Sequence, residues 1–366
     1  MIDLFIIAGE ASGDLHGAHL IEQLLKANPE LKIAAVAGPL MRKFPIECIE
    51  PMESLQVIGL IDVVLALPKI MKLFFSIRKK IIDLKPKVFM AIDYPGFNLR
   101  MHRSLKNCGF SGKQIHYICP TVWAWGKARI PMMVKSLDQL LTIFPFEPAC
   151  FAGTGLNVDY VGHPLIQKTL HFKPDEGFRA RYGFNPEDKI LALFPGSREI
   201  EVKRNLPVMI ETAKKLQSKD NKLKVAICSG HPTLKGDIPT SDNYNLMRQC
   251  HMALAKSGTV ALELALHKVP TVVSYAIKPL DQFLATKIFR INLPYYSMPN
   301  ILLQREVFPE LFGSQLTAEA HYKKAEQLWQ DEKQRDDCRK QCEEIWAILG
   351  TKNASESAAE KIKSFL

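Results

Sequence analysis

Short apolar runs alternate with helical patterns along most of the chain. A first series of runs lies at 2–8, 33–37, 87–92, 115–119 and 139–144, and a second at 189–194, 223–228, 252–255 and 270–275. A short run that is apolar at every position is typical of a parallel strand buried on both faces. In the second half, apolar residues recur at helical spacing within 203–218, 259–268, 279–290 and 317–331. This alternation predicts α/β architecture with doubly wound sheets.

The two series of strands are separated by residues 145–187, which are rich in proline and glycine. Such a segment is typical of a domain boundary, and a chain of 366 residues is long enough for two domains. We therefore expect two Rossmann-like domains, 1–165 and 166–340, that face each other across a cleft. Residues 341–366 form a polar helical pattern with an apolar stripe. We expect this stripe to pack on the first domain or on a partner subunit.

An apolar and basic segment lies at 57–81. Its first part is almost entirely apolar, and its second part contains Phe74, Phe75, Arg78 and Lys79. Two interpretations remain open: a core helix with a solvated basic face, or an interfacial helix that contacts anionic lipid. No run reaches the roughly 18–20 apolar residues of a membrane-spanning helix, and the start of the chain does not resemble a signal peptide. We therefore expect a cytoplasmic protein, or one that lies on a membrane without crossing it.

The formal net charge of +10 indicates an anionic partner, such as nucleic acid, anionic lipid or a phosphorylated metabolite. The basic residues do not gather with stacking aromatic residues, as single-strand binders require, and no helix-turn-helix or zinc-finger pattern occurs. We therefore expect no nucleic acid partner. The eight cysteines contain no CxxC spacing, which favours idle thiols in a reducing compartment over a metal site.

A turn suited to an anionic or sugar ligand follows the first strand. Gly9 and Gly13 bracket it, and Ser12 or Asp14 is placed to cap the next helix. Free N–H groups at a helix N-terminus bind anions, and the carboxylate of Glu10 suits sugar hydroxyls. The GxGxxG pattern of dinucleotide-binding proteins is absent. The alternative is an ordinary turn between a strand and a helix.

Two similar turns lie in the second half of the chain. One follows strand 189–194 and contains an arginine, whose planar fork suits phosphate oxygens. The other opens helix 259–268 at the carboxyl end of a strand, where ligands of α/β proteins bind. A glutamate one turn into that helix is placed to accept both hydroxyls of a ribose. The expected nucleotide diphosphate site consists of Gly196, Ser197, Arg198, Ser257, Gly258, Thr259 and Glu263.

Several further residues are candidates for a site. Asp93 follows a strand and suits a general base, although an Asx turn before the next proline explains it equally well. Trp123 and Trp125 are able to cover an acyl chain or a sugar face, or simply to pack. His163 lies at the expected hinge, and Asn300 is placed either to bind a hydroxyl or phosphate or to start a helix.

Taken in order, these segments resemble the lipid-A-disaccharide synthase family of glycosyltransferases. The likeness covers nearly the whole chain, and its most specific parts are AGEASGD at 8–14 and VWAW at 122–125. The other matching motifs are AGP at 37–39, Ile92-Asp93 with Phe97-Asn98, GHP at 162–164, PGSR at 195–198, SGT at 257–259 and Pro299-Asn300.

The resemblance implies the two-domain GT-B fold, with no metal ion or other cofactor. It implies transfer of 2,3-diacylglucosamine from its UDP conjugate to 2,3-diacylglucosamine 1-phosphate, with inversion and a β(1→6) link. It also implies a peripheral location on the inner membrane of Gram-negative bacteria, which favours lipid contact by segment 57–81, and homodimers with exchanged C-terminal segments. In this scheme Asp93 is the base, and the acceptor is oriented by Glu10, Ser12, Gly13, Asp14 and Asn300.

One connection departs from the family pattern. Residues 228–250 are fewer than the family usually has between these strands, so we expect part of the uridine pocket to be remodelled. The alternative function is that of an isomerase similar to UDP-N-acetylglucosamine 2-epimerase. Such an enzyme shares the two-domain shape but has no need of the basic apolar segment.

Overall fold

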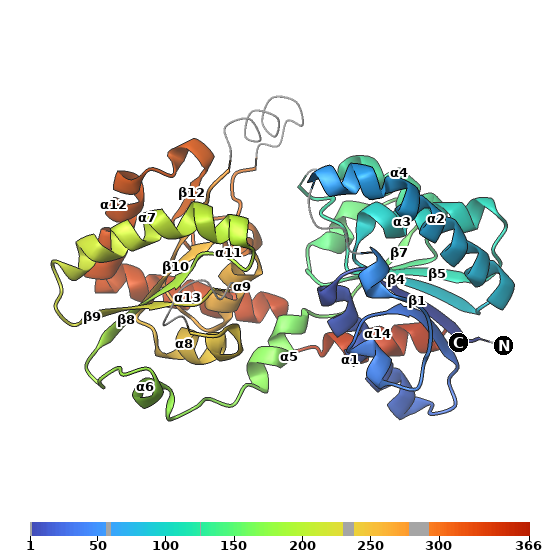
Figure 1. Ribbon diagram of the computed structural model, residues 1–366, viewed down its shortest axis with the longest axis horizontal. Coiled ribbons are helices and arrows are strands. Elements are labelled where there is room, and N and C mark those ends of the chain that lie inside the picture. The colour runs from blue at the N-terminus through green and yellow to red at the C-terminus, as the bar shows by residue number, and fades with distance from the viewer. Residues whose placement is uncertain (1, 56–59, 125, 230–237, 278–292) are drawn as a thin grey trace. The chain divides into compact units, whose positions relative to one another are not determined.

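The computed structural model describes residues 2–55, 60–124, 126–229, 238–277 and 293–366, without the side chains of 60–67 (Figure 1). The chain forms two compact units. Unit 1 comprises Met1–Gln167 and Thr351–Leu366, and unit 2 comprises Lys168–Gly350. The divisions expected from the sequence lay after residues 165 and 340. Residues 341–350 belong to unit 2, so the expected third segment is shared between the two units.

Unit 1 is built on a seven-stranded parallel sheet of order β3-β2-β1-β4-β5-β6-β7. The strands are β1 (Leu4–Ala8), β2 (Ile33–Ala37), β3 (Glu47–Pro51), β4 (Val88–Ile92), β5 (Lys113–Tyr117), β6 (Gln139–Thr142) and β7 (Asn157–Tyr160). The helices are α1 (Ala11–Ala27), α2 (Leu60–Leu84), α3 (Pro95–Asn107), α4 (Ile130–Ser136), α5 (Pro164–Leu170) and α14 (Ala354–Lys363).

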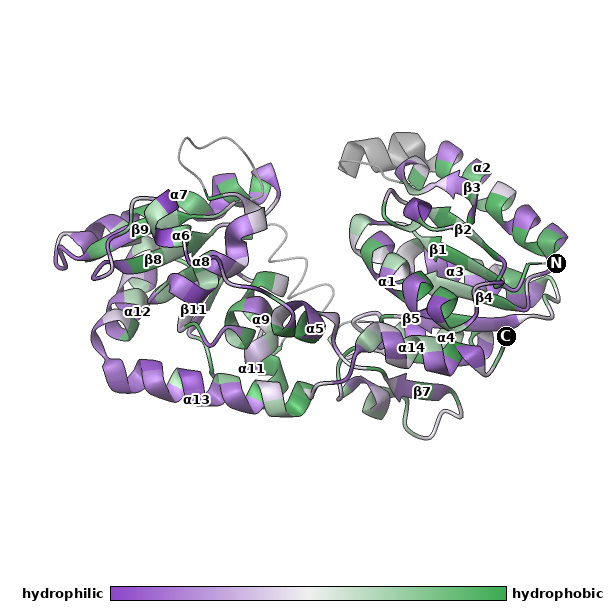
Figure 2. Ribbon diagram, turned by 90° about the horizontal axis from the view of Figure 1, so that it is seen from below, coloured by the Kyte–Doolittle hydropathy of each residue, from purple (hydrophilic) through white to green (hydrophobic). Residues whose placement is uncertain are grey.

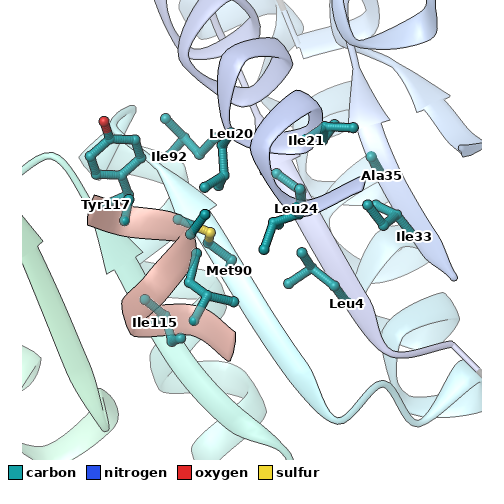
Figure 3. Packing of buried hydrophobic residues seen from close by; sticks show 14 of the residues in the cluster. Leu4, Leu20, Ile21, Leu24, Ile33, Ala35, Met90, Ile92, Ile115 and Tyr117 are labelled. Carbon is teal, nitrogen blue, oxygen red and sulfur yellow. The ribbon is translucent and has the colours of Figure 1, made fainter. Parts of the chain in front are cut away.

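Helices cover both faces of this sheet because alternate strand residues point to opposite sides. Leu4 and Ile6 of β1 pack with α1 and α14 in one core, part of which is shown in Figure 3. Phe5 and Ile7 pack with α2 and α3 in a second core. Helix α14 lies beside α1 (Figure 1), and its Ile362 is fully buried in the first core. Within a single chain, unit 1 therefore covers only the last part of the C-terminal apolar stripe, whereas Ile345 and Leu349 are buried in unit 2.

Unit 2 is built on a five-stranded parallel sheet of order β12-β11-β10-β8-β9. The strands are β8 (Lys189–Phe194), β9 (Leu223–Ile227), β10 (Met252–Lys256), β11 (Thr271–Tyr275) and β12 (Glu310–Phe312). The helices are α6 (Phe178–Arg181), α7 (Glu199–Gln217), α8 (Asn243–Gln249), α9 (Thr259–Leu266), α11 (Met298–Leu303), α12 (Ala318–Gln330) and α13 (Glu332–Leu349). Helices α7 and α12 pack together on the sheet around Met209 and Leu328. Figure 2 shows hydrophobic strands in both units and a largely hydrophilic α13.

The prediction of two Rossmann-like α/β units is confirmed. The strands that the apolar pattern did not predict are β3, β7 and β12, and each lies at the edge of its sheet. The helix expected at 279–290 lies outside the described residues. Among the helices of the described part of the chain, none is both long enough and apolar enough to span a membrane.

Each sheet has a switch point where the strand order reverses. In unit 1 it lies between β1 and β4, where Ala8 pairs with Ile92. In unit 2 it lies between β8 and β10, where Phe194 pairs with Ala255. The turns after paired strand ends lie next to each other, and α/β proteins bind ligands in the crevice at such a point. The turns singled out in the sequence lie at these two positions.

Candidate functional site

The turn after β4 holds Asp93 in an unusual backbone conformation. Asp93 and Tyr94 have φ angles of 46° and 48°, a left-handed conformation that costs non-glycine residues free energy and is enriched at functional sites. The side-chain amide of Asn98, in the first turn of α3, donates to the main-chain oxygens of Ile92 at 3.2 Å and Asp93 at 2.7 Å. The buried Asn98 therefore stabilises the turn that presents Asp93.

Two carboxylates influence each other at this switch point. Burial raises the pKa of Asp93, and the charge of Glu10 raises it further, while the N–H of Tyr94 opposes both effects. Glu10 is exposed and is the N-cap residue of α1, without a side-chain capping bond. The ring of Tyr94 lies so close to Gly9 that a Cβ there would come within 2.3 Å of it. A carboxylate with a raised pKa, next to a second carboxylate, suits proton abstraction.

The rest of the first turn differs from expectation. Neither Ser12 nor Asp14 caps α1; both lie within its first turn, as does the buried Gly13. The buried carboxylate of Asp14 accepts hydrogen bonds from the main-chain N–H groups of Leu40 at 2.8 Å and Met41 at 3.0 Å. Because Asp14 is occupied in holding the chain after β2, the prediction that it contacts an acceptor is wrong. Ser12 is exposed and stays a candidate.

The two histidines near this edge are held neutral. His163 is buried, its ring centroid lies 4.9 Å from that of Phe144, and its Nδ1 accepts the N–H of Leu165 at 3.2 Å. Burial, together with His16, lowers the pKa of His163 to about 3. Burial also lowers the pKa of His16 to about 4. His163 therefore suits packing better than acid catalysis. His16 escaped the sequence prediction, although it follows Ser12 by one helical turn.

A buried glutamate lies near the segment that contains Trp123. Trp123 is partly buried and packs edge-on against Phe146, with ring centroids 5.5 Å apart, whereas Trp125 lies outside the described residues. Glu147, which was not singled out in the sequence, accepts the main-chain N–H groups of Ile143 and Phe144. Burial raises the pKa of Glu147 to about 8. These contacts give Glu147 a structural role at the end of β6.

The second candidate site is a cavity of about 340 Å³ at the switch point of unit 2. Ser257, which was expected to contribute, does not line it; its hydroxyl donates instead to the main-chain oxygen of Tyr296 at 3.3 Å. The predicted residues that line it are Gly196, Ser197, Arg198, Gly258, Thr259 and Glu263. The lining residues that were not predicted are Phe194, Glu201, Cys228, Thr240, Asn243, Lys256 and Val260.

Positive charge gathers at this cavity. Helix α7 begins directly after Arg198, and α9 begins directly after Gly258. The free N–H groups and partial positive charge of a helix N-terminus stabilise anions. The exposed Arg198 and the ammonium of Lys256 add two full charges. The cavity therefore has the chemistry of a phosphate or diphosphate site.

A partly buried ion pair shapes the floor of the cavity. Glu201 accepts a hydrogen bond from Lys256 at 3.1 Å and another from the N–H of Ser197 at 3.2 Å. Burial alone would raise the pKa of Glu201, but Lys256 and these N–H groups outweigh it and the pKa is lowered. Gly196 has a φ of 126°, and a Cβ there would lie 2.6 Å from a carboxylate oxygen of Glu201. Glu201 therefore fixes both the loop after β8 and Lys256.

Glu263 is buried at another side of the same cavity. One of its carboxylate oxygens accepts hydrogen bonds from Lys168 at 3.0 Å and from the hydroxyl of Tyr244 at 2.9 Å. Among the described residues, none donates to its second oxygen. That oxygen is therefore able to accept a ligand hydroxyl, as expected for a ribose.

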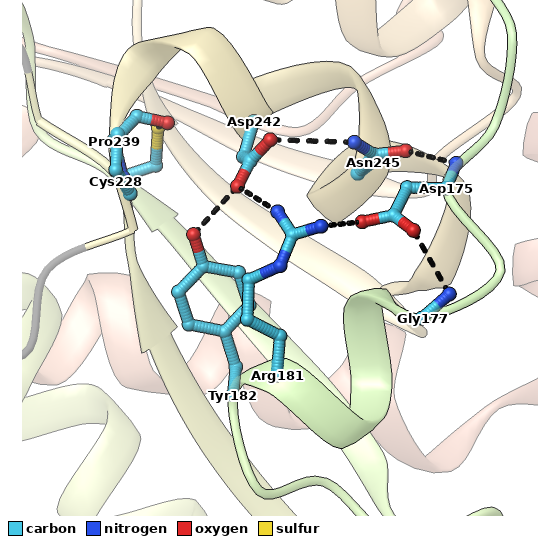
Figure 4. A network of polar contacts seen from close by, with 8 residues as sticks. All are labelled: Asp175, Gly177, Arg181, Tyr182, Cys228, Pro239, Asp242 and Asn245. Atoms are coloured by element: carbon cyan, nitrogen blue, oxygen red, sulfur yellow. Dashed lines mark hydrogen bonds and ion pairs between the residues drawn. The ribbon is translucent and has the colours of Figure 1, made fainter.

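A polar network holds the cavity wall that belongs to the short connection after β9 (Figure 4). Arg181 pairs with Asp175 and, at 3.1 Å, with Asp242, which also accepts the hydroxyl of Tyr182 at 2.6 Å. Two residues of this wall line the cavity, Thr240 and Asn243, and they lie on either side of Asp242. The network therefore limits their movement. Residues 230–237 lie outside the described part, but 243–249 form helix α8 here.

Asn300 does not face a site in unit 2. It is fully buried, and its side-chain oxygen accepts the N–H groups of Val307 at 2.8 Å and Phe308 at 2.9 Å. Its amide donates to the main-chain oxygen of Phe308 at 2.8 Å. Asn300 therefore holds the chain before β12, and the prediction that it orients an acceptor is wrong.

Helix α2 combines a core face with a basic outer face. Phe74 is partly buried and packs against Phe97, with ring centroids 5.3 Å apart, and its lipid contact stays a prediction. Phe75 is 48% exposed, and the guanidinium of Arg78 lies 5.0 Å from the centre of its ring. Lys79 is exposed as well. The outer face thus keeps an apolar side chain between cations.

The comparisons with known proteins agree with the motifs. The profile of the lipid-A-disaccharide synthetase family matches residues 4–363. A lipid-A-disaccharide synthase of Chlamydia pneumoniae is 36% identical over 359 residues, which cover 92% of this chain and 59% of the relative. One from Rhodospirillum centenum is 35% identical over 333 residues, covering 86% of this chain and 82% of the relative. The chain thus spans less than two thirds of the chlamydial relatives.

Solved structures share the fold at low identity. A UDP-GlcNAc 2-epimerase from Neisseria meningitidis, bound to UDP-GlcNAc, has a TM-score of 0.66 at 12% identity and covers 100% of both chains. The glycotransferase of kitacinnamycin has a TM-score of 0.63 at 12% identity, covering 100% of this chain and 99% of its own. At this identity the likeness concerns the fold alone and does not favour an epimerase.

Proposed function

The chain belongs to the lipid-A-disaccharide synthetase family, and we propose that it is an inverting glycosyltransferase that makes the lipid A disaccharide precursor. The donor is UDP-2,3-diacylglucosamine, and the acceptor is 2,3-diacylglucosamine 1-phosphate. The products are the β(1→6) disaccharide and UDP.

The observation that carries this proposal is the cavity of unit 2, where two helix N-termini, Arg198 and Lys256 meet one buried carboxylate. In this role the positive groups bind the diphosphate and Glu263 binds the ribose. As the anomeric bond breaks, negative charge grows on the diphosphate. Groups that are already fixed in place stabilise this charge most strongly in the transition state.

Asp93 is the proposed base in unit 1. Inversion requires the acceptor hydroxyl to attack the face opposite the leaving group, and the hydroxyl must lose its proton as the bond forms. Burial and Glu10 raise the pKa of Asp93, which strengthens it as a proton acceptor. The exposed Ser12 and the N-terminus of α1 are the proposed contacts of the acceptor sugar.

The outer face of α2 is the proposed membrane contact. Phe75 inserts between headgroups, and Arg78 and Lys79 attract anionic lipid. This contact would hold the enzyme on the cytoplasmic face of the inner membrane. A homodimer through exchanged C-terminal segments remains part of the family expectation.

The decisive experiment mixes purified protein with the UDP-sugar and the acylated sugar phosphate and analyses the products by mass spectrometry. We expect stoichiometric UDP and disaccharide. UDP release without disaccharide, or no reaction in the presence of anionic vesicles, would contradict the proposal. Conversion of UDP-N-acetylglucosamine into its 2-epimer would support the isomerase instead.

A further inference from the structure

A second cavity, of about 580 Å³, lies along α3 in unit 1. Its wall on α3 contains Arg100, Arg103 and Ser104, which recur at helical spacing on one face. Arg129 and Met132 form the opposite wall, at and after the start of α4. We call this cavity the arginine groove.

The arginine groove is strongly and exclusively basic. Residues 94–137 contain no aspartate or glutamate, although they include seven lysines and arginines. Among the described residues, none of the guanidinium groups of Arg100, Arg103 and Arg129 forms an ion pair, and Arg100 donates a hydrogen bond to the main-chain oxygen of Gly96. Unpaired guanidinium groups facing one cavity suit a phosphate, which each of them can bind through two hydrogen bonds.

The groove also adjoins the outer face of α2, the proposed membrane contact. Arg78 of α2 donates to the hydroxyl of Ser104, a groove residue, at 3.1 Å. The exposed Phe75 lies against Arg78 on the same helix. Within the groove, Leu99 and Met132 provide apolar surface. This combination fits a phosphate that belongs to an acylated molecule rather than a free metabolite.

The groove begins close to the proposed base. Pro95 and Gly96 line its start and follow Asp93 directly along the turn into α3. With a rise of 1.5 Å per residue, Arg100 and Arg103 lie about 6 and 10 Å along the helix axis from Gly96. A sugar phosphate is of comparable size, so one molecule is able to present a hydroxyl to Asp93 and its phosphate to the arginines.

We propose that the arginine groove binds the phosphate of the acylated sugar phosphate acceptor, an inference that rests on the proposed glycosyl transfer. The groove thereby selects a phosphorylated acceptor over one that lacks the phosphate. It also fixes which hydroxyl of the acceptor reaches the base.

The test compares Arg103→Ala, Arg129→Ala and Arg103→Lys with the control Lys106→Ala. Lys106 also lies on α3 but does not line the groove, so the control removes one charge without changing the groove. Each variant is assayed with 2,3-diacylglucosamine 1-phosphate and with 2,3-diacylglucosamine. We expect the alanine variants at 103 and 129 to raise KM for the phosphorylated acceptor about 10- to 100-fold, as for a lost hydrogen bond between charged groups. Their activity with the unphosphorylated acceptor and their UDP affinity should stay unchanged. Arg103→Lys should recover part of the loss.

Several results would overturn the inference. If the native protein makes disaccharide, an acceptor KM that is the same in the groove variants as in Lys106→Ala would contradict the inference. Weaker flotation with anionic vesicles at unchanged acceptor KM would assign the groove to bilayer headgroups instead. If the native protein makes no disaccharide, the proposed function fails separately. Direct binding of the two acylated glucosamines then decides the groove, because equal affinity for both would exclude a phosphate site.

Discussion

Replacing Gly196 with alanine should disable the phosphate-binding turn of unit 2, whereas the same replacement at Gly183 should not. Both glycines belong to unit 2, and both have positive φ angles, 126° and 71°. A Cβ at 183 meets nothing within 4 Å, whereas a Cβ at 196 would lie 2.6 Å from an oxygen of Glu201 and 2.7 Å from its Cβ. Both replacements therefore introduce backbone strain, but only the one at 196 also displaces Glu201.

The expected magnitudes follow from these contacts. A non-glycine residue in a sparsely populated backbone region costs about 1–3 kcal/mol, and the cost is smaller at 183, whose φ of 71° is near the left-handed region, than at 196, whose φ is 126°. At 196 the displaced Glu201 also loses its bond to Lys256, in a pair whose side chains are each 19% exposed. A charged hydrogen bond contributes about 1.5–3 kcal/mol. Gly196→Ala should therefore destabilise unit 2 by about 1.5–3 kcal/mol more than Gly183→Ala.

Two measurements test this reasoning. Chemical denaturation followed by circular dichroism gives the stability difference, and titration calorimetry with UDP gives the affinity. We expect Gly196→Ala to weaken UDP binding at least tenfold, since loss of the Lys256 contact is worth about that much, and Gly183→Ala to bind UDP as the native protein does. Similar stability and similar UDP affinity of the two variants would refute the role assigned to Glu201.

Further predictions concern unit 1. Asp93→Asn should reduce turnover by about 10²–10⁴-fold with UDP affinity nearly intact, and unchanged turnover would remove Asp93 from the mechanism. Glu10 raises the pKa of Asp93, so turnover of the native enzyme should fall as the pH decreases through this raised pKa. Glu10→Gln should move that fall to lower pH, and a pH profile that does not move would contradict the coupling between the two carboxylates. Asp14→Ala should destabilise unit 1 by about 1–3 kcal/mol, because it leaves buried N–H groups without an acceptor, while acceptor KM stays native. Phe75→Ser with Lys79→Glu should weaken flotation with anionic vesicles, and full binding by this variant would exclude the outer face of α2 as the membrane contact.

The buried part of the fold was predictable from sequence because its strands are apolar at almost every position. The five residues of β1 and the five of β4 are all buried. The edge strands β3, β7 and β12 lack this signal because most of their residues are at least partly exposed, whereas the edge strand β9 was predicted from its apolar run. None of the residues of β3 is fully buried, and β12 has only three residues. The pairing of such strands depends on neighbours that are distant in sequence, so no local pattern indicates it.

The positions of the candidate sites were predictable where a site is formed by a turn between a strand and a helix, as at Gly196 and Thr259, because such turns have a local sequence pattern. The sequence could not distinguish polar residues that face a cavity from those that hold the chain. Asp14 and Asn300 carry the right chemistry, but each is occupied by main-chain N–H groups, 26 residues away for Asp14 and seven for Asn300. Lys256 was missed as a cavity residue because its partner Glu201 lies 55 residues away.

The route of the chain affects the order in which the protein is completed during synthesis. Unit 2 is contiguous, but the first core needs α14, whose Ile362 is buried beside α1. The ribosome must therefore translate the whole of unit 2 before the N-terminal sheet receives its last covering helix. Until then the part of the first core that α14 covers is exposed in the nascent polypeptide, which makes this half of the molecule the expected client of a chaperone.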